Sequence, residues 1–372
     1  MKDILFLFNG PISGTISGGD SHAIHLANFL AKNNDNISVI LPQNTYEKYF
    51  NKRIKIIAYK DGISSGIFFK SNFMLFIFYS SRLIKSIYFL NKTKSDLIIP
   101  ASHLFFDIIP LIFIRNIQIC AFIYHIISDQ KRSLINSRIT SFLEHLSFLI
   151  LKSKKSLVIT DARLVTNSLI DKYGFNSRLI YTSKNGLELK NINSVKVEGK
   201  KYDLVFCGRL NVTKGIYDLI KILQIVKRVI PNVRLAVIGS GPEKENFKQQ
   251  IRNNQLDKNI FMLGFLSDKE KIRTIKESKF FVFPSHEEGW GIVIGESLAC
   301  GVPVISYRIE ELYDIWGKQC TWIDSLNIKK FSEAIIDNLN SRKKYFLDNK
   351  FIKSLDWDQI LKDECLVINN YK

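Results

Sequence analysis

The sequence has few cysteines and no long hydrophobic run. Its five cysteines are scattered over 372 residues without C-x-x-C spacing. This pattern excludes a disulfide framework and a cysteine-rich zinc site, and it predicts a reducing compartment. A run of about 18 uninterrupted apolar residues, as a spanning helix requires, does not occur. The best candidate, Leu104–Ile114, is interrupted by Asp107 and Pro110. The N-terminal segment MKDILFLFNG is too short for a signal peptide and is expected to be a first strand.

Acidic residues are also scarce: 35 Asp and Glu stand against 53 Lys and Arg, giving a formal net charge of +18. Such a surface attracts polyanions. Residues 66–90 combine many aromatic and aliphatic side chains with Lys70, Arg82 and Lys85 and no acid. They suit an interfacial helix on an anionic membrane, although an aromatic stripe also suits a core helix. The absence of an arginine-rich arm argues against nucleic acid. We expect a cytoplasmic protein, peripheral on the inner face of the cell membrane.

Several catalytic signatures are missing. The sequence has neither the P-loop pattern nor the G-x-S-x-G elbow of serine hydrolases. One D-x-D triplet, Asp356-Trp357-Asp358, falls at the start of the last expected helix, where aspartates cap the helix and favour its dipole. We therefore interpret it as structural, and we expect no metal.

The most informative segment is FPSHEEGWGIVIGESLACGVPVIS, residues 283–306. It predicts a strand, a glycine-bearing turn, a helix and a second strand, which together form a parallel crossover unit that binds ligands at its carboxyl end. Glu288 and Glu296 have seven residues between them. With Glu288 on the loop and Glu296 in the first turns of the helix, both carboxylates can line one crevice and accept hydrogen bonds from hydroxyls.

This segment resembles the E-x7-E signature of the retaining glycosyltransferases of family 4, including the trailing sequence ACGVPV, residues 299–304. The resemblance implies an α/β protein of two Rossmann-like domains that face each other across a central crevice (the GT-B type). The expected division is an acceptor-binding domain over residues 1–190, a linker over 191–201 and a nucleotide-sugar-binding domain over 202–355. Residues 356–372 would form a C-terminal helix that packs back on the first domain.

A second match is the family's G-R-x4-K-G element, which consists of Gly208, Arg209, Lys214 and Gly215 in this sequence. An arginine and a lysine near a helix start can neutralise a departing diphosphate. In the first half, Gly18 and Gly19 precede a helix expected near residues 22–32 and would offer backbone amides to the donor diphosphate.

The resemblance assigns further residues to the crevice. His125 ends an apolar strand and matches a histidine that meets the donor sugar in the family. Gly239 lies in a strand-to-helix turn, and the base would be held near Phe265. The sugar hydroxyls would bind Glu288 and the amides of Gly289, Trp290 and Gly291, and the ribose hydroxyls would bind Glu296. The expected catalytic residues are His125, Arg209, Lys214 and Glu288.

The function that this resemblance implies is retaining transfer of a sugar from a nucleotide-diphosphate sugar to a glycan or lipid-linked acceptor. The setting would be synthesis of a bacterial-type surface polysaccharide, lipopolysaccharide or glycolipid. No cofactor or metal is expected, because Arg209 and Lys214 would stabilise the leaving group electrostatically. Two alternatives stay open: a sugar-nucleotide epimerase of the same fold, and a non-catalytic scaffold at the membrane.

Overall fold

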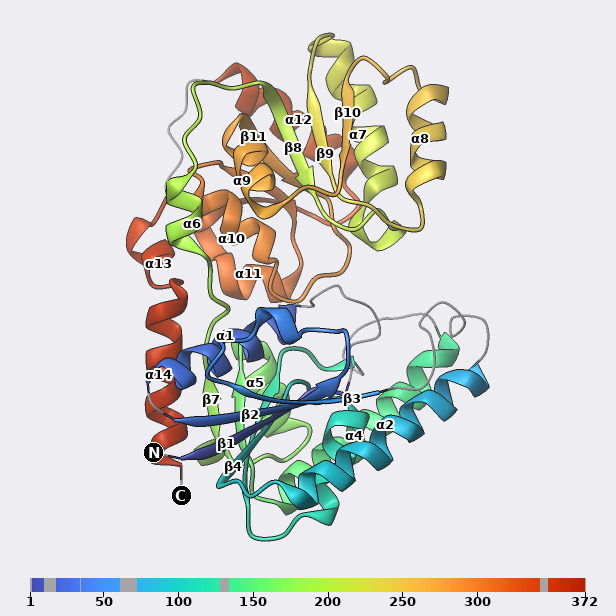
Figure 1. The fold of residues 1–372 in the computed structure, drawn as a ribbon. Coiled ribbons are helices and arrows are strands. Elements are labelled where there is room, and N and C mark those ends of the chain that lie inside the picture. The colour runs from blue at the N-terminus through green and yellow to red at the C-terminus, as the bar shows by residue number, and fades with distance from the viewer. Residues whose placement is uncertain are drawn as a thin grey trace. The chain divides into compact units, whose positions relative to one another are not determined.

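The computed structural model describes residues 2–9, 18–33, 35–60, 72–127, 134–341 and 347–371, without the side chains of 18, 72–78 and 134–138. The chain divides into two compact units. The first unit is Met1–Asn185 together with Asp358–Lys372, and the second is Gly186–Trp357 (Figure 1). Each unit is described by itself.

The first unit is built on a seven-stranded sheet in the order β3-β2-β1-β4-β5-β6-β7, and all the described pairings are parallel. Its central strands are short apolar runs, such as LIIP and LVIT, because both faces of the sheet are covered. The strands are β1 (Asp3–Leu7), β2 (Asn36–Pro42), β3 (Lys55–Tyr59), β4 (Leu97–Pro100), β5 (Gln118–Ile123), β6 (Leu157–Thr160) and β7 (Ile180–Thr182).

Helices cover this sheet and carry its connections. The strand order reverses between β1 and β4, so a switch point lies at the carboxyl ends of these two strands. In Figure 1 the C-terminal helix α14, in red, lies beside α1, in blue, within the first unit. The helices of this unit are α1 (Gly18–Lys32), η1 (Glu47–Tyr49), α2 (Asn72–Lys92), α3 (Phe105–Ile108), η3 (Ile109–Phe113), α4 (Leu134–Ser153), α5 (Arg163–Asp171), η5 (Ser177–Leu179) and α14 (Trp357–Asn370).

The second unit has a six-stranded parallel sheet in the order β10-β9-β8-β11-β12-β13. Its order reverses between β8 and β11, which places the second switch point at their carboxyl ends. The strands are β8 (Tyr202–Cys207), β9 (Leu235–Ile238), β10 (Ile260–Gly264), β11 (Ser278–Phe283), β12 (Val304–Tyr307) and β13 (Cys320–Ile323). The helices are α6 (Leu189–Ser194), η6 (Val212–Lys214), α7 (Ile216–Val229), α8 (Lys244–Asn253), α9 (Asp268–Lys276), α10 (Ile292–Ala299), α11 (Glu310–Trp316), η7 (Gly317–Gln319), α12 (Ile328–Asn340) and α13 (Asn349–Lys353).

Two apolar clusters form the core of this unit, one on each face of the sheet. Leu204 and Phe206 of β8 belong to one cluster, and Val205 and Cys207 belong to the other. This alternation follows the two-residue period of a strand. The fold is therefore two Rossmann-like α/β units, as the sequence predicted.

The passage between the units lies at Asn185–Gly186 and Trp357–Asp358. The sequence suggested a linker over residues 191–201, but this segment belongs to the second unit and α6 covers its first part. Lys276 Nζ donates to the carbonyls of Ile192 and Val195 at 2.6 and 2.8 Å, which ties the segment down. Asp358–Lys372 forms part of the first unit.

Helix α1 begins at Gly18, four residues before the start that the sequence suggested, so Gly18 and Gly19 open its first turn. The expected interfacial segment, residues 66–90, lies outside the described residues up to 71 and continues as α2 from Asn72. None of the helices in the described ranges combines the length and the hydropathy needed to cross a membrane.

Candidate active site

Four parallel strands of the second unit end at the same edge of its sheet, and the predicted site residues follow them. Gly208 and Arg209 come after β8, Gly239 after β9, Phe265 after β10, and the loop 284–291 after β11. Because parallel strands share one direction, these loops gather at the carboxyl edge beside the switch point.

Two glycines allow the loops to approach closely. Gly239 has a φ of +130°, and a Cβ atom there would lie 2.0 Å from the carbonyl oxygen of Gly208. Gly215 has a φ of +67°, and its Cβ would lie 1.7 Å from the carbonyl oxygen of Pro284. Both positions need a conformation and a space that only glycine provides. Gly215 thus brings the segment that carries Lys214 against the loop after β11.

Lys214 and Glu288 meet at this contact. The Nζ atom of Lys214 lies 2.5 Å from Oε2 of Glu288 and donates to the carbonyl of Glu287 at 3.2 Å. The two side chains are 20 % and 21 % exposed. They are partly desolvated, which strengthens their electrostatics, yet they are accessible to a ligand. The structure therefore brings together one predicted cation and one predicted carboxylate.

A second set of contacts fastens the same two segments. The backbone N–H of His286 donates to Thr213 O at 2.8 Å, and the ring Nε2 of His286 lies 2.8 Å from Oδ2 of Asp218 on α7. Tyr307 at the end of β12 donates to the same Asp218 oxygen at 3.3 Å. Asp218 and His286 were not among the predicted residues. The only sequence signal for them was their closeness to Lys214 and Glu288 along the chain.

Glu296 lies in α10 and is paired with Lys271 of α9. The Nζ atom of Lys271 is 2.7 Å from Oε1 of Glu296. Oε2 of Glu296 is buried and has no hydrogen-bond partner among the described residues. Burial raises the pKa of Glu296, and the charge of Lys271 opposes this rise. Sequence reasoning predicted Glu296 as a ligand-binding residue but missed Lys271, whose helix carries no motif.

The remaining predicted residues of the second unit differ in exposure. Arg209 is exposed, and Phe265 is 86 % exposed in the loop after β10. Trp290 is only 5 % exposed and packs edge-on against Trp316, with ring centroids 4.6 Å apart. Since the Trp290 ring faces the core, its contribution to a site is limited to its backbone. Gly291 caps α10 in the left-handed conformation, with φ of +69°.

The residues predicted in the first half of the chain lie in the first unit. Gly18 and Gly19 open α1, and their backbone N–H groups belong to the first turn of that helix. His125 follows β5 and is half-buried, with its ring 5.5 Å from that of His103. His103 is itself buried and lies 3.0 Å from Oε1 of Glu144.

A buried polar network fixes the carboxyl end of β1, just before the glycine segment. The N–H of Asn9 donates to Oδ1 of Asp107 at 2.7 Å, and Arg82 donates to the Asn9 carbonyl at 2.7 Å. Tyr59 donates to Oδ1 of Asn9 at 2.9 Å, and Ser102 Oγ hydrogen-bonds the other Asp107 oxygen. Burial raises the pKa of Asp107 to about 7.

The D-x-D triplet lies where the sequence placed it, at the start of α14. The ring of Trp357 packs on Gly186, where a Cβ atom would lie 2.1 Å from the indole. Within the described ranges, no three His, Cys, Asp or Glu side chains gather closely enough to hold a metal ion.

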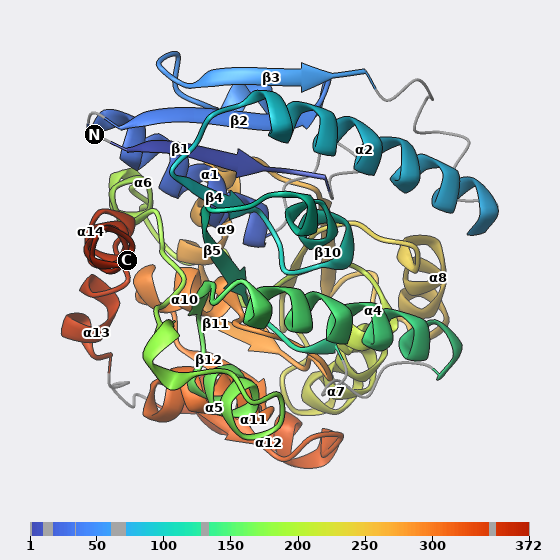
Figure 2. The same ribbon diagram turned by 90° about the horizontal axis from the view of Figure 1, so that it is seen from below.

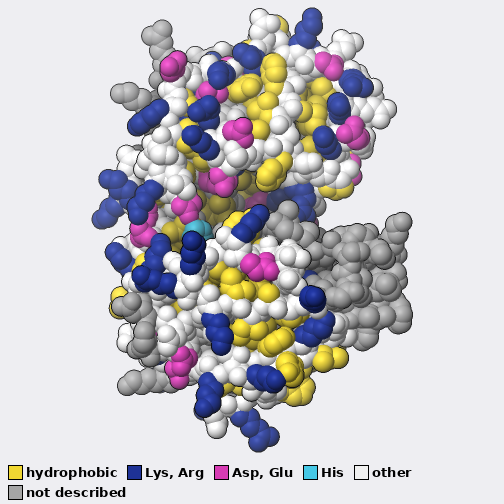
Figure 3. All heavy atoms as spheres, in the orientation of Figure 1, with side chains coloured by type: hydrophobic (Ala, Val, Ile, Leu, Met, Phe, Trp, Pro, Cys, Tyr) yellow, Lys and Arg dark blue, Asp and Glu magenta, His cyan; other side chains and the backbone are white. Residues whose placement is uncertain are grey.

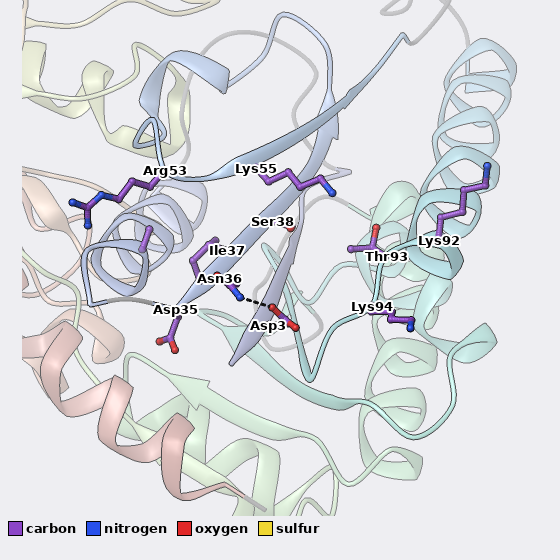
Figure 4. A pocket seen from close by; sticks show the side chains of 11 residues that line it. Asp3, Asp35, Asn36, Ile37, Ser38, Arg53, Lys55, Lys92, Thr93 and Lys94 are labelled. Carbon is purple, nitrogen blue, oxygen red and sulfur yellow. Dashed lines mark hydrogen bonds between the residues drawn. The ribbon is translucent and has the colours of Figure 1, made fainter. Parts of the chain in front are cut away.

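A cavity of about 580 Å³ opens at the amino ends of β1 and β2 in the first unit, at the opposite edge of the sheet from His125 (Figure 4). Its acids are already engaged: Asp3 accepts from Asn36 at 3.0 Å, and Asp35 accepts from the Lys2 N–H at 3.1 Å. Figure 4 shows Arg53 and Lys92 pointing in different directions from its rim. The cavity has no convergent set of groups and is separate from the candidate site.

Fold and site together define a two-domain protein built to hold a nucleotide-linked ligand at the carboxyl edge of a parallel sheet. Residues 188–353, nearly the whole second unit, match the family model described as glycosyl transferases group 1. The crystal structure of Anabaena HepE in complex with UDP and glucose is similar, with a TM-score of 0.75 and 18 % identity over 99 % of this chain and 100 % of that one.

Two curated relatives match parts of the chain. The poly(glycerol-phosphate) alpha-glucosyltransferase of Bacillus subtilis strain 168 is 28 % identical over 149 residues, which are 38 % of this chain and 21 % of the relative. The capsular polysaccharide biosynthesis glycosyltransferase CapM of Staphylococcus aureus is 28 % identical over 233 residues, 56 % of this chain and 58 % of the relative. The chain thus spans about a fifth to three fifths of these relatives' lengths.

Proposed function

We propose that this protein is a glycosyltransferase that moves a sugar from a nucleotide-diphosphate sugar to a glycan or lipid-linked acceptor in surface polysaccharide synthesis. The observation that carries the proposal is the Lys214–Glu288 pair, 2.5 Å apart, in a segment that matches the glycosyltransferase family model. A lysine can neutralise a leaving diphosphate, and a neighbouring carboxylate can accept hydrogen bonds from sugar hydroxyls.

In this proposal the leaving diphosphate is stabilised by charge alone. Arg209 is exposed after β8, and Lys214 lies at the end of η6, directly before α7. Arginine offers a bidentate fork and lysine a point charge, and positioned groups of this kind stabilise the developing negative charge. The amides of Gly18 and Gly19, at the start of α1, would add backbone donors. Transfer would proceed with retention and without a metal.

The donor is proposed to be a UDP-sugar. Support comes from HepE, which has the same fold and is described with UDP and glucose. The two curated relatives are named as a poly(glycerol-phosphate) glucosyltransferase and a capsular polysaccharide enzyme, and both names favour a polymeric acceptor.

The test is a thermal-shift screen of the purified chain against UDP-, GDP-, ADP- and CMP-sugars, with and without EDTA. A ligand present at about 100 times its dissociation constant stabilises the folded state by about 2.7 kcal/mol. Stabilisation by UDP-sugars that EDTA leaves unchanged is the expected result. If none of the donors shifts the transition, the proposal fails.

We further propose that the first unit rests on an anionic membrane through α2, η3 and α4. Helix η3 contacts both α2 and α4, and Figure 2 shows the two helices on either side of this segment. Large apolar side chains on these three elements are exposed: Ile84 69 %, Tyr88 53 %, Phe113 58 %, Ile139 64 % and Phe142 61 %.

Basic side chains lie beside these apolar groups. Arg115 follows η3, and Lys152 and Lys155 end α4 or follow it; all three are exposed. Apolar side chains flanked by cations suit insertion at an anionic lipid surface. On the face that Figure 3 shows, Lys and Arg are spread over both units rather than aligned in one stripe, which does not favour nucleic acid.

Co-sedimentation with vesicles tests this surface. The protein is expected to sediment with phosphatidylserine-containing vesicles, not with pure phosphatidylcholine, and to be released by salt. The double variant Ile139→Ser/Phe142→Ser should lose this binding. Leu366→Ser on α14, where the leucine is 62 % exposed, is the matched control and should bind normally. Equal sedimentation of wild type and the double variant would contradict the proposed surface.

A further inference from the structure

The pair of Lys271 and Glu296 joins two helices of the second unit, and only one half of its carboxylate is satisfied. Nζ of Lys271 lies 2.7 Å from Oε1 of Glu296 and 3.1 Å from Oδ1 of Asp268. The side chains of Lys271 and Glu296 are 18 % and 15 % exposed, whereas Asp268 is 94 % exposed. Lys271 is therefore held mainly by a buried partner.

The other oxygen, Oε2 of Glu296, is buried without a hydrogen-bond partner among the described residues. A buried acceptor left unsatisfied destabilises the folded protein, so such a group is a marker for a missing donor. The donor must be a neutral or positive group that reaches an enclosed carboxylate. A hydroxyl group meets this requirement, because it is small and donates one hydrogen bond.

The surroundings indicate a nucleoside. Ser267 caps α9 through a capping box with Glu270, and the strongly exposed Phe265 lies two residues before that cap. Lys271 therefore belongs to the same strand–helix junction as an exposed aromatic ring, a suitable platform for a base. Glu296 lies on the helix that follows the Glu288 loop.

We propose that Lys271 is a positioning residue: it holds Oε1 of Glu296 so that Oε2 is kept for a ribose hydroxyl, which makes the site selective for ribonucleotides over deoxyribonucleotides. This inference rests on the proposed function, since it assumes that a nucleoside diphosphate occupies the site.

A lysine is suited to this role for two reasons. Its ammonium group fixes the rotamer of the carboxylate through a charge-assisted hydrogen bond. It also keeps Glu296 ionised against the effect of burial, and an ionised carboxylate accepts at both oxygens. Without Lys271 the carboxyl group is free to rotate or to take up a proton, and a protonated oxygen is a poorer acceptor.

The experiment measures dissociation constants by isothermal titration calorimetry for UDP, 2′-deoxy-UDP and 3′-deoxy-UDP, with the matching GDP and ADP series in parallel. For the wild type we expect one deoxy form to bind about tenfold or more weakly, the value of a hydrogen bond to a charged group. In Lys271→Met this ratio should fall to about 2 or less, mainly because ribonucleotide binding weakens.

Three further variants make the result specific. Lys271→Arg keeps a cation and should retain most of the ratio. Lys269→Met removes an exposed lysine from the same helix and should leave the ratio unchanged. Glu296→Gln should lose the ratio as Lys271→Met does, and the double variant should lose no more than either single one.

Two outcomes would overturn the inference alone. One is a wild-type ratio that persists in Lys271→Met; the other is an equal weakening of ribo- and deoxyribonucleotides, which would make Lys271 merely structural. Tighter UDP binding by Lys271→Met would show that the lysine competes with the ligand, and it would overturn the inference as well. Failure of the wild type to bind any nucleoside diphosphate would instead overturn the proposed function and, with it, this inference.

Discussion

His22 and Glu364 form a buried pair although 342 positions separate them: Nε2 of His22 lies 2.9 Å from Oε2 of Glu364. The other carboxylate oxygen accepts from Ser183 Oγ at 2.5 Å. Both paired side chains are almost fully buried, at 1 % and 0 % exposure. The contact fastens the C-terminal helix α14 to α1, directly after the glycines that open that helix. His22 is thus a structural residue.

The first prediction concerns this pair. Glu364→Ala should destabilise the protein by about 3–5 kcal/mol, because it leaves His22 and Ser183 buried without their partner. Urea unfolding followed by circular dichroism measures the loss. Lys362→Ala, an exposed change on the same helix, is the control and should lie within about 0.5 kcal/mol of the wild type. Similar stabilities of Glu364→Ala and Lys362→Ala would refute the role of the pair.

The second prediction concerns Gly215. Gly215→Ala should lower the free energy of unfolding by about 2 kcal/mol or more, since it combines a left-handed φ with a contact of 1.7 Å to the Pro284 carbonyl. Gly199→Ala is the matched control, because a Cβ there meets nothing within 4 Å. Thermal unfolding of both variants distinguishes the cases. A stable Gly215→Ala variant would mean that the two loops do not approach as closely as described.

The third prediction is a pH dependence that depends on Asp107. Burial raises its pKa to about 7, so in the folded state it binds a proton that the unfolded chain has already lost. Its contribution to stability is full below about pH 4 and is lost as the pH rises through about 7. In Asp107→Asn, Oδ1 can still accept from the Asn9 N–H, and Nδ2 can donate to Ser102. This variant should therefore lose that part of the slope.

The measurement is the free energy of unfolding by urea at intervals between pH 5 and 8. The informative quantity is the difference between wild type and Asp107→Asn, because other groups that titrate cancel in it. This difference should favour the variant increasingly as the pH rises. A difference that does not change with pH would exclude a raised pKa at Asp107.

The fourth prediction concerns catalysis. Lys214→Ala and Glu288→Gln should each reduce transfer by about 100-fold or more, the usual effect of removing one group that stabilises a transition state electrostatically. Release of the nucleoside diphosphate from the donor selected by the thermal-shift screen is the assay. Lys221→Ala, an exposed lysine on α7, is the control and should retain full activity. Near-normal turnover of both site variants would remove these residues from the catalytic site.

The sequence predicted the sheets well because their strands are short apolar runs between polar turns. Tyr202–Cys207 matches β8 as predicted, and Gln118–Tyr124 matches β5 to within one residue. Periodicity and turn residues are local properties, so a single sequence reports them directly. Helix α1 was predicted too short because Gly18 and Gly19 are poor helix formers, and only the surrounding structure shows that they open its first turn.

Pairings between distant residues could not be predicted. Nothing in the local pattern of α9 distinguishes Lys271 from its neighbour Lys269, yet only Lys271 reaches Glu296. Likewise, Asp218 looked like an ordinary residue at a helix start, and its contact with His286 depends on the order of the strands. Motifs identified Lys214, Glu288 and Glu296, whereas the groups that hold them required the fold.

The second unit begins and ends at neighbouring points. The N–H of Leu187 donates to the Leu355 carbonyl at 2.7 Å, and Leu187 forms a parallel bridge with Asp356. In topological terms, Gly186–Trp357 is one continuous insertion into the first unit, and its two ends meet. An insertion of this kind can be excised and replaced without stretching its host, because the replacement needs only the same short separation between its ends. This nucleotide-binding half is therefore a natural cassette for making chimeras with a different donor specificity.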